Sequence, residues 1–276
     1  MKKILLTGAA GDVGRRITPM LKAAYPGLVL SDLKAPADTH GLKFVKADIA
    51  NFAETAAAVA GIDGIVHLGG YSVEGPWESI LNANIVGCYN LFEAARAAGV
   101  KRVIFASSNH AVGFYPRSTT IPHDVTVLPD SRYGVSKAFG EALGAMYAMK
   151  HGMGVTCLRI GNVNETPLDM RRMAIMLHPE DLVQLIRIGL DHPDIVFEVL
   201  YGASANTRAW WDNSRAKALG YRPKHDSEGQ LAAAKTGQAA IPAEPIGDFY
   251  QGGTFASAEY TANFAVLKGW KAPLRP

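Results

Sequence analysis

A glycine-rich turn near the start of the chain constrains its fold more than any other feature. Residues 4–6 form a short apolar run, Ile-Leu-Leu, typical of a buried parallel strand. The turn that follows spaces Gly8, Gly11 and Gly14 evenly, and residues 15–25 then carry apolar side chains at helical spacing. This order of strand, glycine turn and helix is the one that a dinucleotide-binding fold requires.

The three glycines have separate expected roles, although their G-x-x-G-x-x-G spacing differs from the commonest dinucleotide fingerprint. Gly8 allows the tight turn, Gly11 lets the backbone approach a pyrophosphate, and Gly14 lets the helix pack closely on the strand. The pyrophosphate would lie at the helix N-terminus, where backbone N–H groups point outward. We therefore expect this loop, including Asp12 and Val13, to bind the cofactor.

An acidic residue ends the second predicted strand, which covers residues 28–30. Asp32 follows Gly14 at close to the spacing of about 20 residues expected for the acid that holds the adenosine ribose hydroxyls. A carboxylate at this position repels a ribose phosphate, which favours NAD over NADP. Lys34 is the counter-argument, because a lysine could pair with that phosphate. We give more weight to Asp32 because it stands at the strand end.

Strand and helix patterns alternate over the first two-thirds of the chain. Further strands are predicted at 42–47, 64–68, 102–106 and 155–160. The alternation predicts an α/β fold with a parallel, doubly wound sheet, the Rossmann fold. We expect residues 1–165 to form the cofactor-binding domain with the catalytic residues. Residues 166–276 would form a small C-terminal substrate-binding extension packed on it in a single compact unit, with 271–276 frayed.

Polar and small residues follow several of these strands, at the edge where doubly wound sheets bind ligands. Asp48 and Ile49 follow the third strand and would contact the adenine ring. Gly69 and Gly70, after Leu68, would let a cofactor approach closely. The other residues expected to contact a ligand at this edge are Asn84, in a helix predicted over 77–98, and a set of strand-end residues. These strand-end residues are Ser107, Ser108, Asn109, His110, Ile160 and Asn162.

A tyrosine and a lysine stand four residues apart in a segment predicted to be helical. Tyr133 and Lys137 therefore share one face of the helix. A free tyrosine titrates near ~10 and is a poor base at neutral pH. A neighbouring ammonium stabilises the phenolate, which makes the tyrosine a usable general base. The spacing alone is a weak signal, and it gains weight from the glycine loop and from Ser108.

Composition excludes several classes of function. The net charge is +3, with no basic run that would indicate nucleic acid binding. Cys88 and Cys157 lie in apolar segments and are expected to be buried thiols, so neither a disulfide nor a metal site is predicted. No segment approaches the ~20 apolar residues of a membrane helix. A soluble cytoplasmic protein is the expectation.

The motifs together resemble a known enzyme family. The glycine loop, Asp32, Ser108, Tyr133 and Lys137 are similar to the extended short-chain dehydrogenase/reductase family over roughly residues 1–200. Four further segments resemble the uronate dehydrogenases within it: 68–74 (LGGYSVE), 105–110 (FASSNH), 210–213 (WWDN) and 251–255 (QGGTF). The resemblance implies oxidation of D-galacturonate and D-glucuronate at the anomeric carbon with NAD, giving aldarolactones. It also implies a homo-oligomer.

The resemblance assigns roles to individual residues. Tyr133 would be the general base, Lys137 would stabilise its phenolate and hold the nicotinamide ribose, and Ser108 would bond to the reacting hydroxyl. Arg171 would clamp the uronate carboxylate, although Arg172 beside it leaves the register open. The residues expected to contact the sugar are Ser72, Ser108, Asn109, His110, Tyr133 and Asn162. A small hydroxylated residue would be expected at the last of these positions.

Structural roles compete with several of these assignments. His67 lies within an apolar strand and is expected to be a satisfied core residue. Asn84 could bridge within its own helix or organise the active-site lysine. Trp210 and Trp211 are expected to serve packing or subunit contacts rather than to stack on a sugar. Arg171 and its neighbour could simply be a solvated surface pair.

Two other functions remain open from the sequence. A nucleotide-sugar epimerase or dehydratase shares the fold, but such enzymes usually need a larger C-terminal domain than this chain offers. A redox-sensing regulator could bind NAD through the same loop without catalysis. The presence of Ser108, Tyr133 and Lys137 together argues against the regulator. The sequence does not choose between galacturonate and glucuronate.

Overall fold

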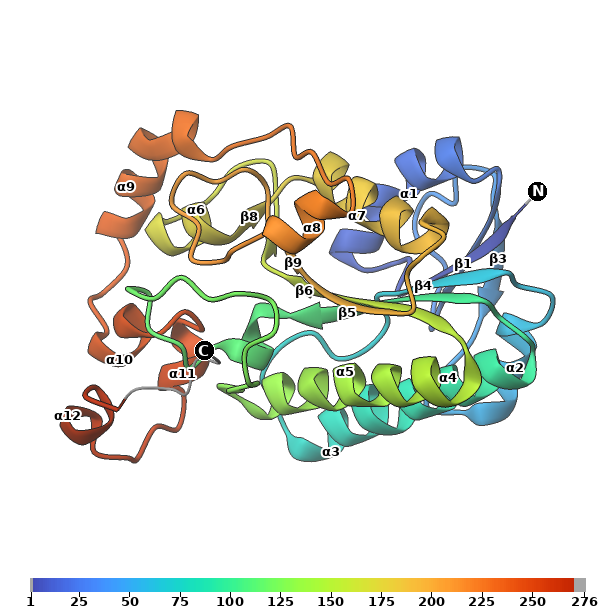
Figure 1. Cartoon of the computed structure of the whole chain (residues 1–276), viewed down its shortest axis with the longest axis horizontal. Coiled ribbons are helices and arrows are strands. Elements are labelled where there is room, and N and C mark those ends of the chain that lie inside the picture. The colour runs from blue at the N-terminus through green and yellow to red at the C-terminus, as the bar shows by residue number, and fades with distance from the viewer. Residues whose placement is uncertain (1, 271–276) are drawn as a thin grey trace.

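A seven-stranded parallel sheet forms the centre of the molecule in this computed structural model, which describes residues 2–270 (Figure 1). The strand order is β3-β2-β1-β4-β5-β6-β9. The bounds are β1 Lys3–Thr7, β2 Gly27–Asp32, β3 Lys43–Lys46, β4 Gly64–His67, β5 Arg102–Ser108, β6 Gly154–Ile160 and β9 Phe197–Gly202. All six pairings are parallel, and the order reverses between β1 and β4. The predicted doubly wound α/β fold is confirmed.

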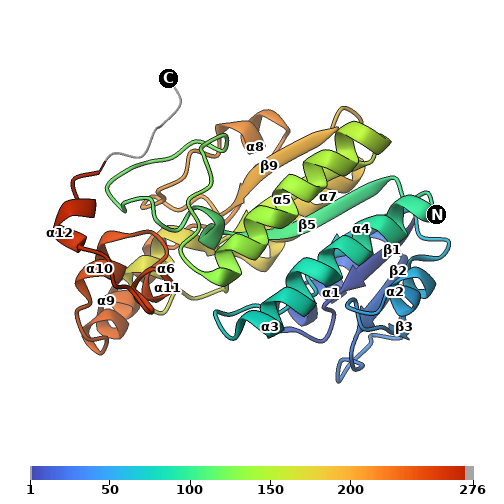
Figure 2. The same ribbon diagram turned by 90° about the horizontal axis from the view of Figure 1, so that it is seen from below.

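Helices cover both faces of the sheet, as Figures 1 and 2 show. The helices on one face are α1 (Asp12–Ala24) and α7 (Pro179–Asp191). Those on the other are α2 (Phe52–Val59), α4 (Gly87–Ala97) and α5 (Arg132–His151). Alternate strand residues feed separate apolar clusters on the two faces, because successive side chains of a strand point to opposite sides. Ile4 and Leu6 of β1 join the first cluster and Leu5 joins the second.

The helix predicted over 77–98 is one run interrupted by a π-helical turn. Trp77–Ile80 (α3) is followed by π-helical Leu81–Val86 and then by α4. Asn84 lies in this turn and is buried. Its amide bonds to both backbone groups of Tyr71 and to the Ser136 hydroxyl, at 2.7 to 2.9 Å. Asn84 therefore bridges between elements rather than within its helix, at the type of distortion that often marks a functional site.

The C-terminal part lies mostly across the carboxyl ends of the strands (Figures 1 and 2). Its smaller elements are β7 Asn162–Val163, α6 Met170–Ile175, β8 Met176–Leu177, α8 Ser214–Ala218, a 3₁₀ turn Glu228–Gln230, α9 Leu231–Ala239, α10 Pro245–Phe249, α11 Thr254–Ser257 and α12 Phe264–Leu267. Thr254 and Phe255, the last two residues of the 251–255 segment, begin α11.

The boundary predicted at residue 165 does not coincide with a break in the sheet. After that point the chain returns α7 to one face and β9 to the edge beside β6. The division into two functional parts stays a prediction. The fraying expected for residues 271–276 lies outside the described part of the chain. Among residues 2–270, none of the helices combines the length and apolar character needed to cross a membrane.

The core contains the expected histidine and thiols. Cys88 and Cys157 are buried and unpaired. His67 is buried at 2% exposure, and its Nδ1 lies 2.7 Å from the Thr7 hydroxyl. That hydroxyl accepts from the Gly69 N–H, so its own proton is free to go to Nδ1. Burial, and secondarily the charge of Lys137, lowers the pKa of His67 to about 3.

Replacing His67 by Asn should make the protein less sensitive to acid. Unfolded histidine titrates near ~6.5, whereas folded His67 stays neutral down to a pKa of about 3. Only the unfolded state therefore gains this proton as the pH falls below ~6.5, and stability is lost at about 1.4 kcal/mol per pH unit. Between pH 7 and pH 5 the free energy of unfolding, measured with urea, should fall by about 2 kcal/mol more in the wild type than in the variant. If the free energy of unfolding changes equally with pH in the two proteins, the His67 ring is not buried in its neutral form as we infer.

Candidate active site

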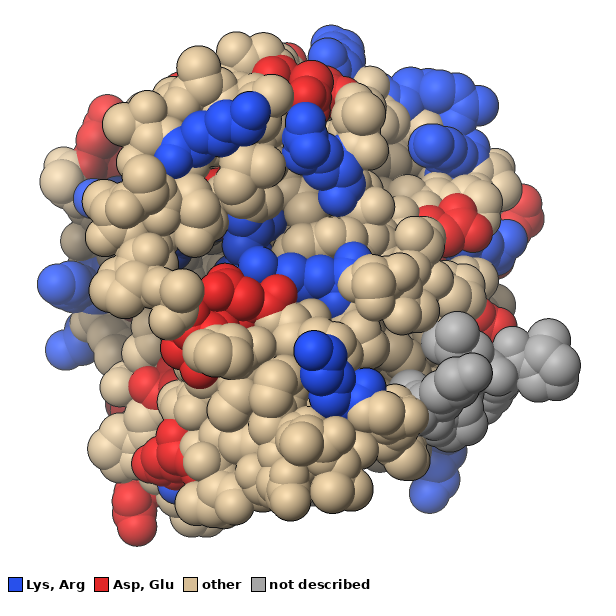
Figure 3. Space-filling model, turned by 90° about the vertical axis from the view of Figure 1, so that its left-hand side faces the viewer, with Lys and Arg blue, Asp and Glu red and all other residues tan. Residues whose placement is uncertain are grey.

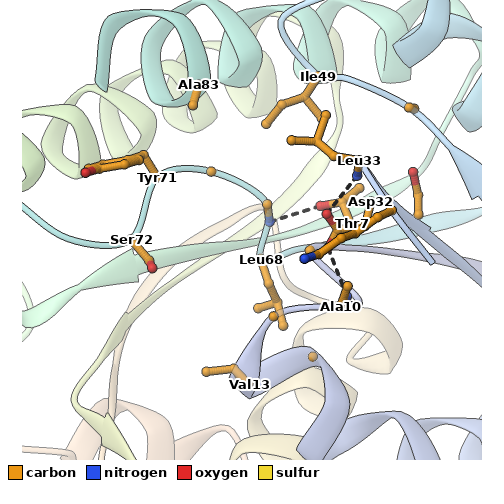
Figure 4. A pocket seen from close by; sticks show the side chains of 18 of the residues that line it. Thr7, Ala10, Val13, Asp32, Leu33, Ile49, Leu68, Tyr71, Ser72 and Ala83 are labelled. Carbon is orange, nitrogen blue, oxygen red and sulfur yellow. Dashed lines mark hydrogen bonds between the residues drawn. The ribbon is translucent and has the colours of Figure 1, made fainter. Parts of the chain in front are cut away.

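A cavity of about 480 Å³ opens at the carboxyl edge of the sheet between β1, β2 and β4 (Figure 4). Figure 3 views this edge directly and shows a hollow with basic and acidic side chains around it. The predicted cofactor contacts among its lining are Gly8, Gly11, Asp12, Val13, Gly14, Asp32, Asp48, Ile49, Leu68, Gly69 and Gly70. Ser72, predicted to contact the sugar, also lines it. The structure therefore brings these sequence-selected residues to one surface.

The glycine loop has the close approaches that its spacing predicts. Gly8 has a φ of 71°, and a Cβ on it would lie 2.7 Å from the backbone of Leu68 and Gly69. A Cβ on Gly14 would overlap the Gly8 carbonyl oxygen, so α1 begins directly against the turn only because this position has no side chain. Gly11 is the N-cap of α1, and its N–H donates back to Gly8 at 3.1 Å. The outward N–H groups of α1 thus face the cavity.

The Asp32 carboxylate is held at the end of β2 by two backbone donors. Its Oδ2 accepts from the Ala10 N–H at 2.9 Å and its Oδ1 from the Leu33 N–H at 2.7 Å (Figure 4). Ala10 belongs to the glycine loop, so this hydrogen bond fixes the position of the Asp32 carboxylate relative to the loop. Lys34, the residue that could pair with a ribose phosphate, is exposed and lines the same cavity.

The tyrosine and lysine project from the first turns of α5. Ser131 caps this helix by accepting from Gly134 N–H, and Glu74 accepts from the Tyr133 N–H at 2.9 Å. Lys137 Nζ donates to the Ala106 carbonyl at 2.8 Å and lies 5.4 Å from the centre of the Tyr133 ring. Both side chains are less than a tenth exposed. The ammonium is therefore fixed beside the phenol by β5.

The two serines at the end of β5 have different surroundings. Ser107 donates to Glu141 Oε1 at 2.6 Å inside the core, where Arg159 pairs with the same carboxylate. Ser108 caps the 3₁₀ turn Asn109–Val112 by accepting from His110 N–H at 3.2 Å. The Ser107 hydroxyl is thus engaged within the fold, so its predicted cofactor contact would have to use the backbone. The Ser108 hydroxyl retains its proton for a ligand.

A histidine stands beside Tyr133. The His110 ring packs edge-on to Tyr133, with centroids 5.8 Å apart, and stacks on Phe255 at 3.9 Å. Its Nδ1 lies 2.7 Å from Oδ2 of Asp130, whose side chain is fully buried. Sequence reasoning missed both Asp130 and Phe255 as site residues. Phe255 belongs to the QGGTF segment, so a signal for it existed, whereas nothing in the sequence pairs Asp130 with His110.

The side chains of the two neighbouring arginines, Arg171 and Arg172, bond to different partners. Arg172 pairs with Asp169, the N-cap of α6. Arg171 Nε donates to the Gln251 carbonyl at 2.8 Å. With the Asn109 amide oriented by its hydrogen bonds, Oδ1 accepts from Arg171 Nη2 at 3.1 Å and Nδ2 donates to the Ile160 carbonyl at 3.2 Å. Arg171 is therefore the arginine that meets the predicted sugar-contacting residues.

Arg171 forms no salt bridge among residues 2–270, so its charge has no carboxylate partner there. Burial, and next the positive charge of Arg117, lowers its pKa from 12.5 to about 10. The guanidinium is still charged at neutral pH, but it is poorly solvated. An anionic ligand would relieve this cost, and a guanidinium matches a carboxylate bidentately.

Comparisons with known proteins agree with this geometry. The profile of the NAD dependent epimerase/dehydratase family matches residues 4–170. Uronate dehydrogenase of Agrobacterium fabrum is 44% identical over 260 residues, which cover 92% of this chain and 97% of that protein. Uronate dehydrogenase of Pseudomonas putida is 42% identical over 258 residues, covering 93% and 96%. The chain belongs to the uronate dehydrogenase family.

A solved structure extends the similarity to three dimensions. It is an alanine-for-tyrosine variant of uronate dehydrogenase from Agrobacterium tumefaciens, in complex with NAD. That protein is 43% identical, covers 93% of this chain and 97% of its own, and superposes with a TM-score of 0.85. The fold of this member of the uronate dehydrogenase family is therefore shared along nearly its whole length.

Three more of the residues considered in the sequence have surroundings that bear on their expected roles. Trp211 is buried, stacks on Tyr201 at 5.0 Å and donates to Gln251 Oε1 at 2.9 Å, so the expected packing role is confirmed. Arg117 lies over Trp210, 5.5 Å from its ring centre. Asn162 is partly buried, and its Oδ1 is buried with no hydrogen-bond partner among residues 2–270. Its predicted sugar contact stays a prediction.

Proposed function

We propose that the chain catalyses NAD-dependent oxidation of D-galacturonate and D-glucuronate at the anomeric carbon, giving the aldarolactone. The observation that carries this proposal is the Arg171 guanidinium, which is partly buried, has no acidic partner among residues 2–270, and lies in the same site as Tyr133 and Lys137. A uronate differs from its parent sugar by one carboxylate, which is the group that this guanidinium fits. Family membership gives the same reaction.

NAD is the cofactor that the glycine loop fits. The backbone of Gly8, Gly11 and Gly14 leaves open the space above the α1 N-terminus, and Asp32 stands where the adenosine ribose hydroxyls would bond. When bound, NAD supplies the acceptor for the hydride. The cofactor contacts proposed at Asn84, Ser107, Tyr133, Lys137 and Ile160 rest on the family resemblance.

The protein residues move one proton and hold the sugar. Tyr133 Oη, as the phenolate, takes the proton from the anomeric hydroxyl and becomes the phenol. The fixed charge of Lys137 stabilises the phenolate that makes this transfer. The Ser108 hydroxyl donates a hydrogen bond to the reacting oxygen. Ser72, Asn109, His110 and Asn162 orient the ring hydroxyls, while Arg171 fixes the carboxylate and penalises neutral sugars.

The decisive assay follows NADH formation by the purified protein with NAD and either D-galacturonate or D-glucuronate. Galactose, glucose and NADP serve as controls. A uronate- and NAD-dependent signal that neutral sugars do not give is the expected result. A folded protein that binds NAD but gives no signal would remove the uronate proposal and favour a nucleotide sugar as substrate; nothing in the structure favours that alternative or a non-catalytic regulator.

Replacing Asp32 by Asn should weaken the preference for NAD over NADP. The substitution keeps the shape of the side chain and removes the charge that would repel a ribose phosphate, while Lys34 remains at the rim. We expect the ratio of kcat/KM for NAD over NADP to fall by about tenfold or more, as loss of one charged contact would give. Steady-state kinetics with both cofactors measures it. An unchanged ratio would show that Asp32 does not select the cofactor.

A cytoplasmic location, a homo-oligomeric assembly, the absence of a resident metal and the division at residue 165 remain parts of the proposal. Outside the active site, His178, Glu180 and His225 bring potential ligand atoms within 4.8 Å of one another. His178 caps α7, and His225 lies 3.2 Å from the Glu180 carboxylate. These contacts give each residue a structural role.

A further inference from the structure

A fully buried carboxylate lies behind the active-site histidine. Asp130 Oδ2 is 2.7 Å from His110 Nδ1, and the Asp130 N–H donates to the His110 carbonyl at 3.3 Å. The carboxylate has no exposed surface, while the histidine side chain keeps 11%. Because Nδ1 is engaged with Asp130, the ring nitrogen available to a ligand is Nε2.

Three glycines surround this carboxylate. A Cβ on Gly113 or on Gly252 would overlap Asp130 Oδ2, and a Cβ on Gly134 would lie 3.2 Å from Oδ1. These glycines come from the turn after His110, from the C-terminal segment and from α5. Gly252 N–H also donates to the Gly113 carbonyl at 2.8 Å, so two of the glycines around the carboxylate are bonded to each other. Segments far apart in the sequence thus leave space at one point for a single carboxylate.

Ser131 determines which carboxylate oxygen of Asp130 is left to bond to His110. Its Oγ accepts from Gly134 N–H at 3.0 Å and donates its proton to Asp130 Oδ1 at 2.7 Å. The other oxygen, Oδ2, is an acceptor and faces Nδ1. A carboxylate there selects the tautomer of His110 with the proton on Nδ1, because only that tautomer donates to it.

We propose that Asp130 is a positioning residue of the active site: it holds His110 with its proton on Nδ1, so that Nε2 accepts a hydrogen bond from a sugar hydroxyl. The inference rests on the proposed function for the identity of the hydroxyl. The edge contact with Tyr133 and the stack on Phe255 fix the plane of the ring, so Nε2 has one direction. A substrate must therefore present a donor at this position, and Asp130 acts on that hydroxyl through His110.

The variant Asp130→Asn reverses this arrangement without changing the volume. The Ser131 proton requires the amide oxygen on its side, so the NH₂ group faces Nδ1. An NH₂ donor selects the opposite tautomer, with the proton on Nε2. The sugar hydroxyl then meets a donor, and we expect kcat/KM for uronate to fall about 10- to 100-fold, the effect of a buried hydrogen bond lost with its partner left unpaired.

Two measurements test the proposal. Nitrogen-15 NMR of histidine-labelled protein, with His110 assigned from the His110→Gln variant, should show a protonated Nδ1 and a bare Nε2 in the wild type, and the reverse in Asp130→Asn. A bare Nδ1 or an imidazolium in the wild type, or an unchanged tautomer in the variant, would overturn it. The wild-type spectrum decides even if the variant does not fold, and it is independent of whether uronate is the substrate.

A double-mutant cycle separates positioning from a general structural effect. In the His110→Gln background, Asp130→Asn should cause no further loss of kcat/KM, because its effect passes through the imidazole. An equal loss in both backgrounds would overturn the proposal. The dissociation constant for NAD should stay within a few-fold throughout. Asp124→Asn, an exposed change in the same loop, is the matched control and should behave as wild type.

Discussion

Tyr133→Phe should retain NAD binding and lose nearly all turnover. The ring fills the same space, so its packing against His110 and Phe255 is kept. The phenol oxygen that accepts the anomeric proton is gone, and Lys137 has no phenolate to stabilise. General acid–base catalysis contributes about 10²–10⁴ to the rate, and we expect kcat to fall by about that factor. Stopped-flow NADH formation and calorimetric NAD titration measure the two quantities.

A matched tyrosine controls for the loss of a hydroxyl as such. Tyr89 on α4 is 49% exposed and lies outside the site, so Tyr89→Phe should leave kcat unchanged. Full activity in Tyr133→Phe would remove the proposed mechanism. A parallel loss of NAD affinity and thermal stability would instead show that the phenol supports the fold.

Arg171→Met should raise KM for uronates far more than KM for NAD. The methionine approximates the length of the side chain but lacks the charge that would bind the carboxylate. Truncating one partner of a buried charged pair typically costs about 2–5 kcal/mol, so we expect kcat/KM for uronate to fall by about 10²-fold or more. The cavity proposed to hold NAD is lined by the glycine loop and the end of β2, and Arg171 on α6 does not line it. The preference for uronates over neutral sugars should shrink by a similar factor.

Arg172→Met tests whether the correct arginine was chosen. Arg172 pairs with Asp169 at the start of α6, so its removal should affect stability slightly and KM for uronate less than tenfold. Equal increases in KM for uronate and NAD in Arg171→Met would point to damaged folding, since the variant also loses the donor to the Gln251 carbonyl. A larger effect from Arg172 would reverse the assignment.

Local patterns predicted the sheet and the cofactor loop well because each depends on neighbouring residues. The apolar runs at 4–6 and 64–68 become β1 and β4, and the glycine spacing forms the turn between β1 and α1. The helix over 77–98 was predicted as a whole, but its π-helical turn was not, because Asn84 bonds to Tyr71 and Ser136, which no local pattern reveals.

Sequence alone thus determined the fold class, the cofactor loop and the pairing of Tyr133 with Lys137, since strand alternation and helical spacing are short-range properties. Tertiary structure decided which arginine meets Asn109, that Ser107 serves the core, and that Asp130 stands behind His110. Each of these depends on where a side chain ends when distant segments meet. Gly113, Gly134 and Gly252 show the reason: the space they leave for one carboxylate exists only after the C-terminal segment has folded back onto the site.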